Sequence, residues 1–282
     1  MASDALQRHH RAIRPFEILQ GSVVDWPYLN YRYRMSNTEK TDLGGKRVLI
    51  CGGTTGVGRA TAMLLAAEGC KVFICGRNED HLADAIHEIR ALGGDISGVP
   101  ADLGETKGVM TLFEKADEWL GGLDFAILNA GIGSHGLLTT MTHEHCREVV
   151  SVNLLSYISC SLEAMRRMTE SGGGHIVMTG SMSAHVFDEE AAVYVATKAG
   201  IRGFATSLRK EANSSGIKVT LIEPGTISSD MVDETTEQQD EMIDGLRMLR
   251  ASDVAEAIVF MLTRPKRCDV IQLQLRPHLQ RI

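Results

Sequence analysis

The sequence predicts an α/β domain in which a doubly wound, mostly parallel seven-stranded sheet carries helices on both faces. Short apolar runs rich in β-branched residues alternate with helical patterns through most of the 282-residue chain, as parallel sheets with crossover helices require. A glycine-rich turn joins the first such run to the next helix, and the length suits one large domain. Strands are expected at residues 47–51, 71–75, 96–100, 123–128, 174–179, 217–222 and 269–275.

The first strand leads into a turn suited to a dinucleotide. Residues 47–51 are apolar and β-prone, and a helical pattern follows the turn from Arg59 to Glu68. Glycines let the backbone approach a pyrophosphate, and the helix N-terminus supplies N–H groups and positive dipole. An ordinary glycine turn is the alternative, but the strand–turn–helix order favours a dinucleotide-binding (Rossmann) site. Its predicted residues are Gly52, Thr54, Thr55, Gly56, Val57 and Gly58.

The second strand suggests which dinucleotide binds. An acid near the end of this strand would bind the adenine ribose of NAD. Here Gly76 occupies that place and Arg77 follows it. An arginine pairs well with a 2′-phosphate, so NADP(H) is the preferred cofactor and NAD(H) a possible one. The alternative is a solvated surface arginine, and Glu79 and Asp80 are close enough in sequence to compete for it.

A proton-transfer site is predicted in the second half of the chain. Tyr194 and Lys198 are four residues apart, so on a helix they share a face. Ser181 follows the apolar run 176–178. A nearby cation favours the phenolate form of a tyrosine, and a serine hydroxyl can hold a substrate oxygen. Together these groups could transfer the proton when a carbonyl is reduced to an alcohol or the alcohol is oxidised.

From about Leu43 to Val270, the chain resembles the short-chain dehydrogenase/reductase family in its single-domain form. The glycine motif matches with Cys51 in place of threonine, and Asn129-Ala130-Gly131 matches with Leu128 in place of an asparagine. Asn153, Ser181, Tyr194 and Lys198 match the family's catalytic tetrad at the expected spacings. The resemblance also implies that the cofactor contacts Asp102, Leu103, Asn129, Ala130, Gly131, Tyr194, Lys198, Pro224, Gly225, Ile227 and Ser229.

The resemblance implies a role for each member of the tetrad. Ser181 would hold the substrate oxygen, and Tyr194 would act as general acid in reduction and general base in oxidation. Lys198 would lower the pKa of Tyr194 and bind the nicotinamide ribose, while Asn153 would hold a water that relays protons. The alternatives are a strand-end cap for Ser181, a solvated polar residue for Asn153 and a surface lysine for Lys198.

The chain is predicted to divide into an N-terminal arm, residues 1–44, and a catalytic domain, residues 45–282. The arm is expected to dock on its own domain or on a partner subunit, because a solvated tail rarely carries so many aromatic residues. Its arginines would also suit a transit peptide, but interspersed acids argue against that reading. The aromatic residues of the arm are Phe16, Trp26, Tyr28, Tyr31 and Tyr33.

Residues 226–248 are predicted to form a substrate lid. The lid is acidic over residues 230–242, which either suits a cationic or polar substrate or, as the favoured alternative, marks the solvated face of a helix. His185, with Val186 and Phe187, is expected to line the pocket entrance and contact substrate. The acids at 188–190 would oppose a carboxylate substrate if they face inward.

Composition limits the remaining functions. The net charge of −7 gives no support for nucleic-acid binding, and no apolar run is long enough to span a bilayer. The six cysteines are expected to be reduced core thiols in a cytoplasmic protein. No metal site is predicted, since His143 and His145 would point apart on a helix. The family resemblance implies a homotetramer, or a homodimer, formed through the helices near residues 142–169 and 191–213.

The leading hypothesis is an NADP(H)-dependent oxidoreductase that interconverts a carbonyl and a secondary alcohol on a small-molecule substrate. The last 35 residues or so are similar to the branch of NADP-dependent 3-hydroxy acid and serine dehydrogenases. The alternative is a non-catalytic NADP(H)-binding redox sensor, against which the intact tetrad argues. An epimerase or dehydratase is disfavoured because too few residues follow the seventh strand to form an added substrate domain.

Overall fold

The computed structural model describes residues 40–229, 232 and 234–281. The chain divides into two units, Met1–Thr38 and Glu39–Ile282. The first unit lies outside the described residues, and with it all but the end of the predicted arm. Within the second unit, Leu43 is buried in the core, and Thr41 bonds through its N–H to the carbonyl of Thr263 at 3.0 Å. The folded domain therefore includes residues from the end of the predicted arm.

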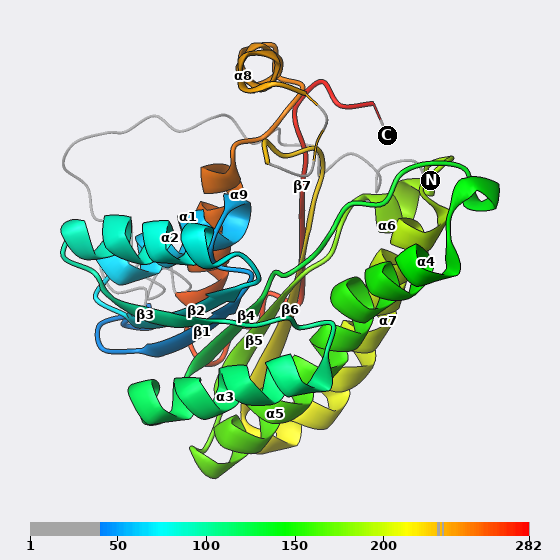
Figure 1. Ribbon diagram of the computed structural model, residues 1–282. Coiled ribbons are helices and arrows are strands. Elements are labelled where there is room, and N and C mark those ends of the chain that lie inside the picture. The colour runs from blue at the N-terminus through cyan, green and yellow to red at the C-terminus, as the bar shows by residue number, and fades with distance from the viewer. Residues whose placement is uncertain (1–39, 230–231, 233, 282) are drawn as a thin grey trace, which may run out of the picture. The chain divides into compact units, whose positions relative to one another are not determined.

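Seven strands form one parallel sheet in the order β3-β2-β1-β4-β5-β6-β7 (Figure 1). This confirms the predicted fold class. The strand order reverses between β1 and β4, and in such sheets ligands bind in the crevice outside the carboxyl ends at this point. The strands are β1 (Arg47–Cys51), β2 (Lys71–Gly76), β3 (Asp95–Pro100), β4 (Phe125–Leu128), β5 (Gly174–Thr179), β6 (Ile217–Pro224) and β7 (Gln272–Leu275).

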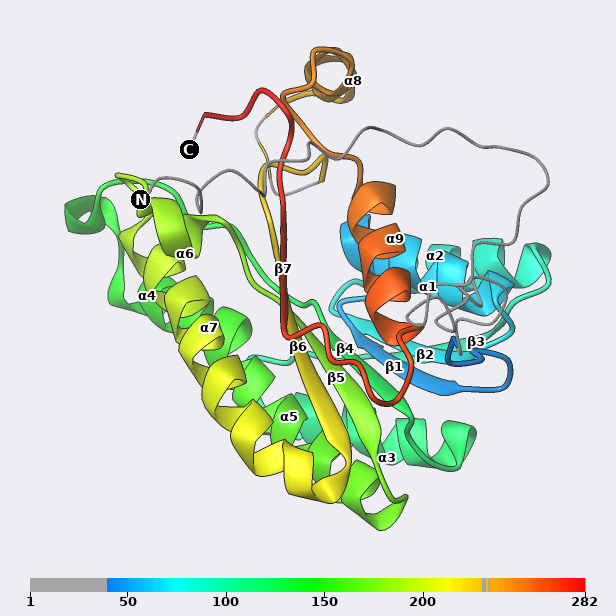
Figure 2. The same cartoon turned by 180° about the vertical axis from the view of Figure 1, so that it is seen from behind.

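One face of the sheet is covered by α1 (Gly56–Ala67), α2 (Glu79–Ala91) and α9 (Ala251–Leu262) (Figure 2). Successive side chains of a strand point to opposite faces. Val48 and Ile50 of β1 therefore face these helices, and both are fully buried. Leu49 and Cys51 face the other way. The apolar run in the sequence is thus explained by a strand that is buried on both faces.

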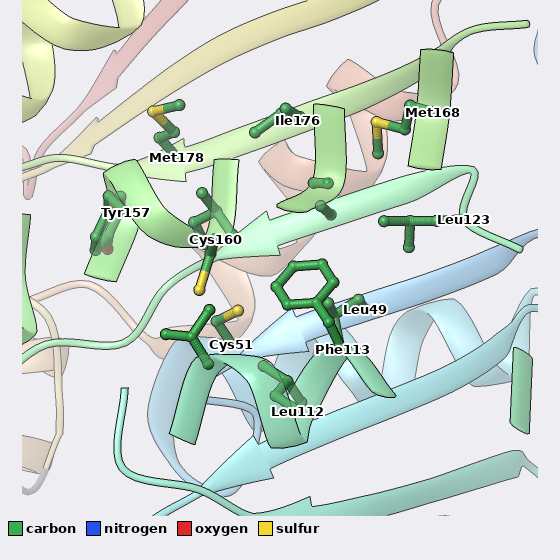
Figure 3. Close-up of a cluster of buried hydrophobic side chains, with 14 of the residues drawn as sticks. Leu49, Cys51, Leu112, Phe113, Leu123, Tyr157, Cys160, Met168, Ile176 and Met178 are labelled. Carbon is green, nitrogen blue, oxygen red and sulfur yellow. The ribbon is translucent and has the colours of Figure 1, made fainter. Parts of the chain in front are cut away.

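The opposite face is covered by α3 (Thr106–Leu120), α5 (Ser156–Glu170) and α7 (Ala192–Ala212). Figure 3 shows Phe113 of α3 over this face, with Cys160 of α5 beside Cys51 and Tyr157 of the same helix beyond Cys160. Fully burying each such large apolar side chain stabilises the fold by about 1.5–3 kcal/mol. The buried hydroxyl of Tyr157 donates to the carbonyl of Thr179 at 3.1 Å.

The cysteines follow the prediction only in part. All six are free thiols, and four of them are buried. Contacts with the thiols of Cys160 and Cys75, together with burial, raise the pKa of the Cys51 thiol. Cys146 is half-buried and Cys268 is exposed, so the prediction of core thiols does not hold for these two.

The long helix expected near residues 142–169 is interrupted. It consists of α4 (His143–Val150), a π-helical turn (Ser151–Leu155) and α5. π-Helical turns inside helices occur often at functional sites, and Asn153 lies on this one. Among the described residues, no helix combines the length and apolar character needed to cross a membrane.

Two short helices follow β5 and β6. The first, α6 (Ser183–Val186), lies between β5 and α7. The second, α8 (Thr236–Asp244), lies within the predicted lid and starts with a capping box formed by Thr235 and Gln238. Both helices therefore follow the carboxyl ends of their strands, where the crevice opens.

Candidate active site

A cavity of about 820 Å³ lies at the carboxyl ends of the strands. It is bordered by the glycine turn after β1, the loops after β2 to β6, the start of α7 and the C-terminal tail. The structure brings together all but three of the predicted site residues on its wall; Gly58, Asn153 and His185 lie outside it. The predicted residues that line it are Gly52, Thr54, Thr55, Gly56, Val57, Arg77, Asp102, Leu103, Asn129, Ala130, Gly131, Ser181, Tyr194, Lys198, Pro224, Gly225, Ile227 and Ser229.

The glycine turn has the geometry that a diphosphate cradle requires. Gly52 and Gly56 have φ values of 74° and 52°, a conformation that favours glycine. A Cβ on Gly52 would lie 2.8 Å from the Cα of Ala130. Thr55, the residue before α1, makes no side-chain cap bond to the helix, so it does not occupy the N–H groups of the first turn. Such groups bind anions well.

Gly58 supports the cradle from behind. It packs on the backbone of Gly52, where a Cβ would collide with the carbonyl oxygen and come within 3.0 Å of Asn129 Nδ2. Close helix–strand packing is the role of the third glycine in dinucleotide-binding turns. Its position outside the cavity is therefore consistent with a role in shaping the turn.

Replacing Gly58 by alanine is expected to destabilise the domain by about 1–3 kcal/mol, because overpacking forces the turn and α1 apart. Nucleotide affinity should fall with it. Thermal unfolding and nucleotide titration would measure the two effects. Gly203→Ala on α7 is the matched control, since a Cβ there meets nothing within 4 Å and alanine favours a helix. Equal behaviour of the two variants would refute this explanation of Gly58.

Asn129 joins the carboxyl ends of three strands. Its Nδ2 donates to the carbonyl of Gly52 at 3.2 Å, and its Oδ1 accepts from the hydroxyl of Thr179 at 3.0 Å. The side chain of this cavity residue is thus held on both sides. The bonds fix the loop after β4 relative to the glycine turn and to the end of β5.

Ser181, Tyr194 and Lys198 converge in the cavity. Ser181 follows β5, and Tyr194 and Lys198 lie one turn apart on α7. The Lys198 side chain is buried; its Nζ donates to the carbonyl of Thr179 at 3.1 Å and lies 5.5 Å from the centre of the Tyr194 ring. The predicted convergence of these groups is therefore present in the structure.

Burial has the largest effect on the pKa values of Tyr194 and Lys198. Burial raises the pKa of Tyr194, and the hydrogen bond with Ser181 offsets only part of this effect. Burial also lowers the pKa of Lys198 from 10.5 to about 8. Burial is thus the largest cause of the shift at both residues, and the prediction that Lys198 lowers the pKa of the phenol stays a prediction. A phenol that stays protonated near neutrality is suited to donating a proton.

Asn153 lies behind the cavity wall and bonds to the loop after β4. It is fully buried, its Oδ1 accepts from the N–H of Ile132, and its Nδ2 donates to the carbonyl of Ile132, both at 2.8 Å. Both side-chain groups are therefore engaged with the backbone. The side chain therefore fixes the loop after Gly131, and the predicted role of Asn153 in holding a relay water stays a prediction.

Arg77 lines the cavity at the end of β2 and also pairs with a residue that does not line it. Its guanidinium lies 3.0 Å from the carboxylate of Glu148 on α4. The predicted competitors, Glu79 and Asp80, lie at the start of α2, and no ion pair joins either of them to Arg77 among those found in the described residues. Both partners of the Arg77–Glu148 pair are about half exposed, so the pair is weak.

The structure corrects the prediction for His185. Its ring does not line the cavity but lies 2.9 Å from the carboxylate of Glu223 at the end of β6. Its neighbours Ser183 and Val186 line the wall instead. Phe187 is exposed and has a φ of 59°, so the chain turns sharply after α6.

The C-terminal tail contributes residues that sequence reasoning missed. Gln280 and Arg281 line the cavity, and Gln280 Oε1 accepts from the N–H of Thr226 at 3.2 Å. Leu279 bonds through its N–H to the carbonyl of Leu246 in the predicted lid. No motif marks these residues, and 54 positions separate Gln280 from Thr226. The tail thus holds the turn after Pro224-Gly225.

The acids of the lid segment fall into two groups. Glu234 lines the cavity, as does Asp188 from the loop after α6. Glu237, Asp240 and Glu241 are exposed on α8, as expected for the solvated face of a helix. Residues 230, 231 and 233 lie outside the described residues. Where the chain is described, no group of three His, Cys, Asp or Glu side chains could hold a metal ion.

Comparison with known proteins identifies the family. The pattern of the short chain dehydrogenase family matches residues 46–240. An uncharacterized oxidoreductase of Staphylococcus aureus (strain MRSA252) is 30% identical over 237 residues, which are 84% of this chain and 99% of the relative. A similar uncharacterized oxidoreductase of Staphylococcus haemolyticus is also 30% identical, with the same coverage.

Solved structures have the same fold. A variant of actinorhodin polyketide ketoreductase with NADPH has a TM-score of 0.77 and 25% identity, covering 84% of this chain and 98% of that one. A short chain dehydrogenase from Burkholderia cenocepacia in complex with NADP has a TM-score of 0.75 and 29% identity, with the same coverage. The chain belongs to the short-chain dehydrogenase/reductase family of oxidoreductases.

Proposed function

We propose that the protein is an NADP(H)-dependent oxidoreductase that interconverts a carbonyl group and a secondary alcohol. The observation that supports this most strongly is the convergence of Ser181, Tyr194 and Lys198 in one cavity with a diphosphate cradle. A hydroxyl, a phenol and an ammonium group in this arrangement can hold and protonate a carbonyl oxygen.

The residues present fit a nicotinamide dinucleotide. The cradle formed by Gly52 and Gly56 would hold the diphosphate at the start of α1, and Arg77 would pair with a 2′-phosphate. The turn from Pro224 to Ser229, on the same cavity wall, would hold the nicotinamide. When bound, the cofactor supplies or accepts the hydride. The similar structures with NADPH and NADP support this choice of cofactor.

The protein groups would orient the substrate and move one proton. Ser181 would hold the carbonyl oxygen, and Tyr194 would donate its phenolic proton to that oxygen as the carbon receives hydride. The resulting phenolate would be stabilised by the Lys198 ammonium and reprotonated from solvent. Oxidation reverses each transfer, so that Tyr194 removes the proton of the alcohol. The main contributions are orientation and electrostatic stabilisation.

The cavity wall limits the substrate only broadly. Asp188 and Glu234 carry negative charge, while Arg281 is positive and His135 lies among them on the same wall. Charges of both signs suit a polar substrate of small or intermediate size. The proposal therefore extends to ketones, 3-oxo acids and sugars as candidate substrates.

Nucleotide titration and a substrate screen test the function. NADPH and NADH binding would be followed by fluorescence, and oxidation of NADPH would be measured with each candidate carbonyl compound. NADPH binding with turnover of at least one substrate is the expected result. Nucleotide binding without turnover of any tested substrate would instead favour the redox-sensor alternative.

Replacing Arg77 by alanine should weaken NADPH binding by about 10–100-fold, because a charge-assisted hydrogen bond contributes roughly 1.5–3 kcal/mol. NADH affinity should not change, since NADH has no 2′-phosphate. Glu148→Gln is the matched variant; it removes the competing carboxylate and should strengthen NADPH binding. Titration of both nucleotides measures the effect, and an equal loss for NADPH and NADH would contradict the phosphate role.

The helices expected to pack between subunits support a further proposal, that the chain assembles as a homotetramer or homodimer. Leu155, Ile158 and Leu162, at and after the π-helical turn, are all exposed in the single chain. Exposed apolar side chains that lie together on one helix are typical of protein interfaces.

A further inference from the structure

Five polar side chains meet behind the cavity wall, and we call them the Glu223 cluster. Its centre is the carboxylate of Glu223, which is fully buried. Glu223 Oε1 is buried without a hydrogen-bond partner among the described residues. A buried charge with one unpaired oxygen is costly, so this cluster requires an explanation. Its members are His185, Arg202, Glu223, Gln272 and Gln274.

Every bond to Glu223 in the cluster is made to its other oxygen. Oε2 lies 2.9 Å from His185 Nε2, and it accepts hydrogen bonds from Gln274 Nε2 at 3.1 Å and from Gln272 Nε2. The side chains come from α6, β6 and β7. They therefore tie α6 to the edge of the sheet through a single carboxylate oxygen.

The protonation of His185 follows from its second neighbour. Arg202 on α7 lies with its guanidinium nitrogen 2.9 Å from His185 Nδ1. A guanidinium only donates hydrogen bonds, so Nδ1 accepts and Nε2 carries the proton toward Glu223. His185 is then a neutral bridge between a cation and an anion. In this tautomer Gln274 Nε2, also 2.9 Å from His185 Nε2, donates to Glu223 and not to the ring.

The cluster lies directly opposite the proposed catalytic serine. Gly180 bonds through its N–H to the carbonyl of Ile222 at 2.7 Å, and Met182 bonds through its N–H to the carbonyl of Pro224 at 2.9 Å. On the segment that follows β5, these two bonds lie on either side of Ser181. On β6 they lie on either side of Glu223.

Side-chain packing adds to these contacts between the Ser181 segment and β6. A Cβ on Gly180 would lie 2.9 Å from Glu223 Cγ, so Glu223 fills the space beside the residue that precedes Ser181. His185 lies four residues after Ser181 on α6 and bonds to the same carboxylate. The chain from Gly180 to His185 is thus held at its start by the backbone of β6 and at its end by the Glu223 carboxylate.

We infer that Glu223 and His185 are positioning residues that hold Ser181 in register with Tyr194. They do so by tying the chain from Gly180 to α6 against the carboxyl end of β6. Neither residue touches the cavity, so both act through Ser181. This inference rests on the proposed function, because alignment of Ser181 matters only if Ser181 holds a substrate oxygen. Small misplacements of a substrate-orienting group can cost about 10²-fold in rate.

The inference is tested with two substitutions at His185. His185→Ala removes both hydrogen bonds, and kcat is expected to fall by up to about 10²-fold while NADPH affinity is unchanged. His185→Gln retains one donor and one acceptor, and it should recover much of the lost rate. An alanine variant with unchanged kcat would overturn the inference, as would a glutamine variant no more active than the alanine variant.

His175 provides the control for simple loss of stability. It is a buried histidine of β5, near the opposite end of the strand from Ser181, and its ring bonds to the hydroxyl of Thr220 at 2.7 Å. His175→Ala should lower thermal stability but leave kcat unchanged. If His175→Ala lowers kcat as much as His185→Ala does, the effect is one of stability and the inference fails.

A double-mutant cycle tests whether the two residues act together. If His185 and Glu223 act through the hydrogen bond between them, the double variant His185→Ala/Glu223→Gln should lose little more activity than the worse single variant. Additive losses would show two independent effects and would overturn the inference.

Hydrogen exchange separates this inference from the proposed function. Exchange of the amides of residues 180–187 should accelerate in His185→Ala but not in His175→Ala, because only the first releases the tie. This readout needs no substrate. Absence of turnover in the wild-type protein would defeat the proposed function alone, whereas unchanged exchange in His185→Ala would overturn the positioning role.

Discussion

Replacing Tyr194 by phenylalanine is expected to reduce turnover by about 10²–10⁴-fold, the usual contribution of a positioned general acid. The phenol lines the cavity within hydrogen-bond reach of Ser181, and phenylalanine keeps its shape but has no proton to donate. The fold and NADPH affinity should be unchanged, because the ring can pack as before. Steady-state oxidation of NADPH with an identified substrate would measure the loss, and nucleotide titration would show that binding persists.

Tyr157 supplies a matched control for the loss of one buried hydroxyl. It lies under the same cavity on α5, and its hydroxyl donates to the carbonyl of Thr179, but it does not line the wall. Tyr157→Phe should cost roughly 1 kcal/mol of stability from the lost hydrogen bond and should keep its turnover. If Tyr194→Phe retained wild-type turnover, the tyrosine would not be the general acid, and the sensor alternative would gain support.

The fold could be predicted because its signals are local. The inner strands are mostly apolar runs such as Arg47–Cys51, which is buried on both faces of the sheet, and helical patterns lie between the strands along the chain. The glycine turn is likewise specified over a few residues by conformations that only glycine adopts easily. For the same reason the cavity wall contains most of the residues predicted from sequence motifs.

Contacts between residues distant in sequence could not be predicted. His185 stands between two residues expected in the active site, and no local pattern indicates that it pairs with Glu223, 38 positions later. The partner of Arg77 is Glu148, 71 positions away, while Glu79 and Asp80 were nearer in sequence. Such pairs depend on how strands and helices meet in three dimensions.

Asn153 and the tyrosine pKa show a second limit. The residue type and spacing at Asn153 match the family, but only the structure shows that both its side-chain groups bond to Ile132. The pKa of Tyr194 is raised by burial, and the hydrogen bond with Ser181 lowers it in part. Sequence spacing indicates that Lys198 is near, but it carries no measure of burial, and burial has the larger effect here.

Replacing Lys198 by methionine is expected to abolish turnover and, at neutral pH, to stabilise the protein. The ammonium is buried and its pKa is lowered by burial from 10.5 to about 8. Methionine has a similar length and no charge, so it removes this cost. The gain in unfolding free energy should be on the order of 1–3 kcal/mol. The Thr179 carbonyl would still accept from the Tyr157 hydroxyl.

The pH dependence of the stability gain distinguishes removal of a buried charge from better packing of the methionine side chain. Below about pH 8 the lysine is charged in both the folded and the unfolded wild-type protein, so the full cost of burial is present. Between about pH 8 and 10.5 the folded lysine loses its proton while the unfolded one keeps it, so stability rises with pH. The advantage of the methionine variant should therefore be large at pH 7 and small at pH 10.

Chemical denaturation of both proteins at the two pH values would measure this change. Lys210→Met is the control, because Lys210 lies exposed near the end of the same helix and its charge is not buried. A Lys198→Met advantage that is equal at pH 7 and pH 10 would point to packing, and no advantage at either pH would show that the ammonium is not penalised.

A variant that is both more stable and inactive would connect the structure to the chemistry. A charged lysine in a buried site lowers the stability of the fold, and methionine would pack there without this loss. Folding alone therefore does not explain why the lysine is present. The charge becomes useful only when a phenolate forms beside it, one helical turn away on α7. The wild-type protein would then be less stable because it places the Lys198 ammonium beside Tyr194, where transfer of the proton leaves a negative charge.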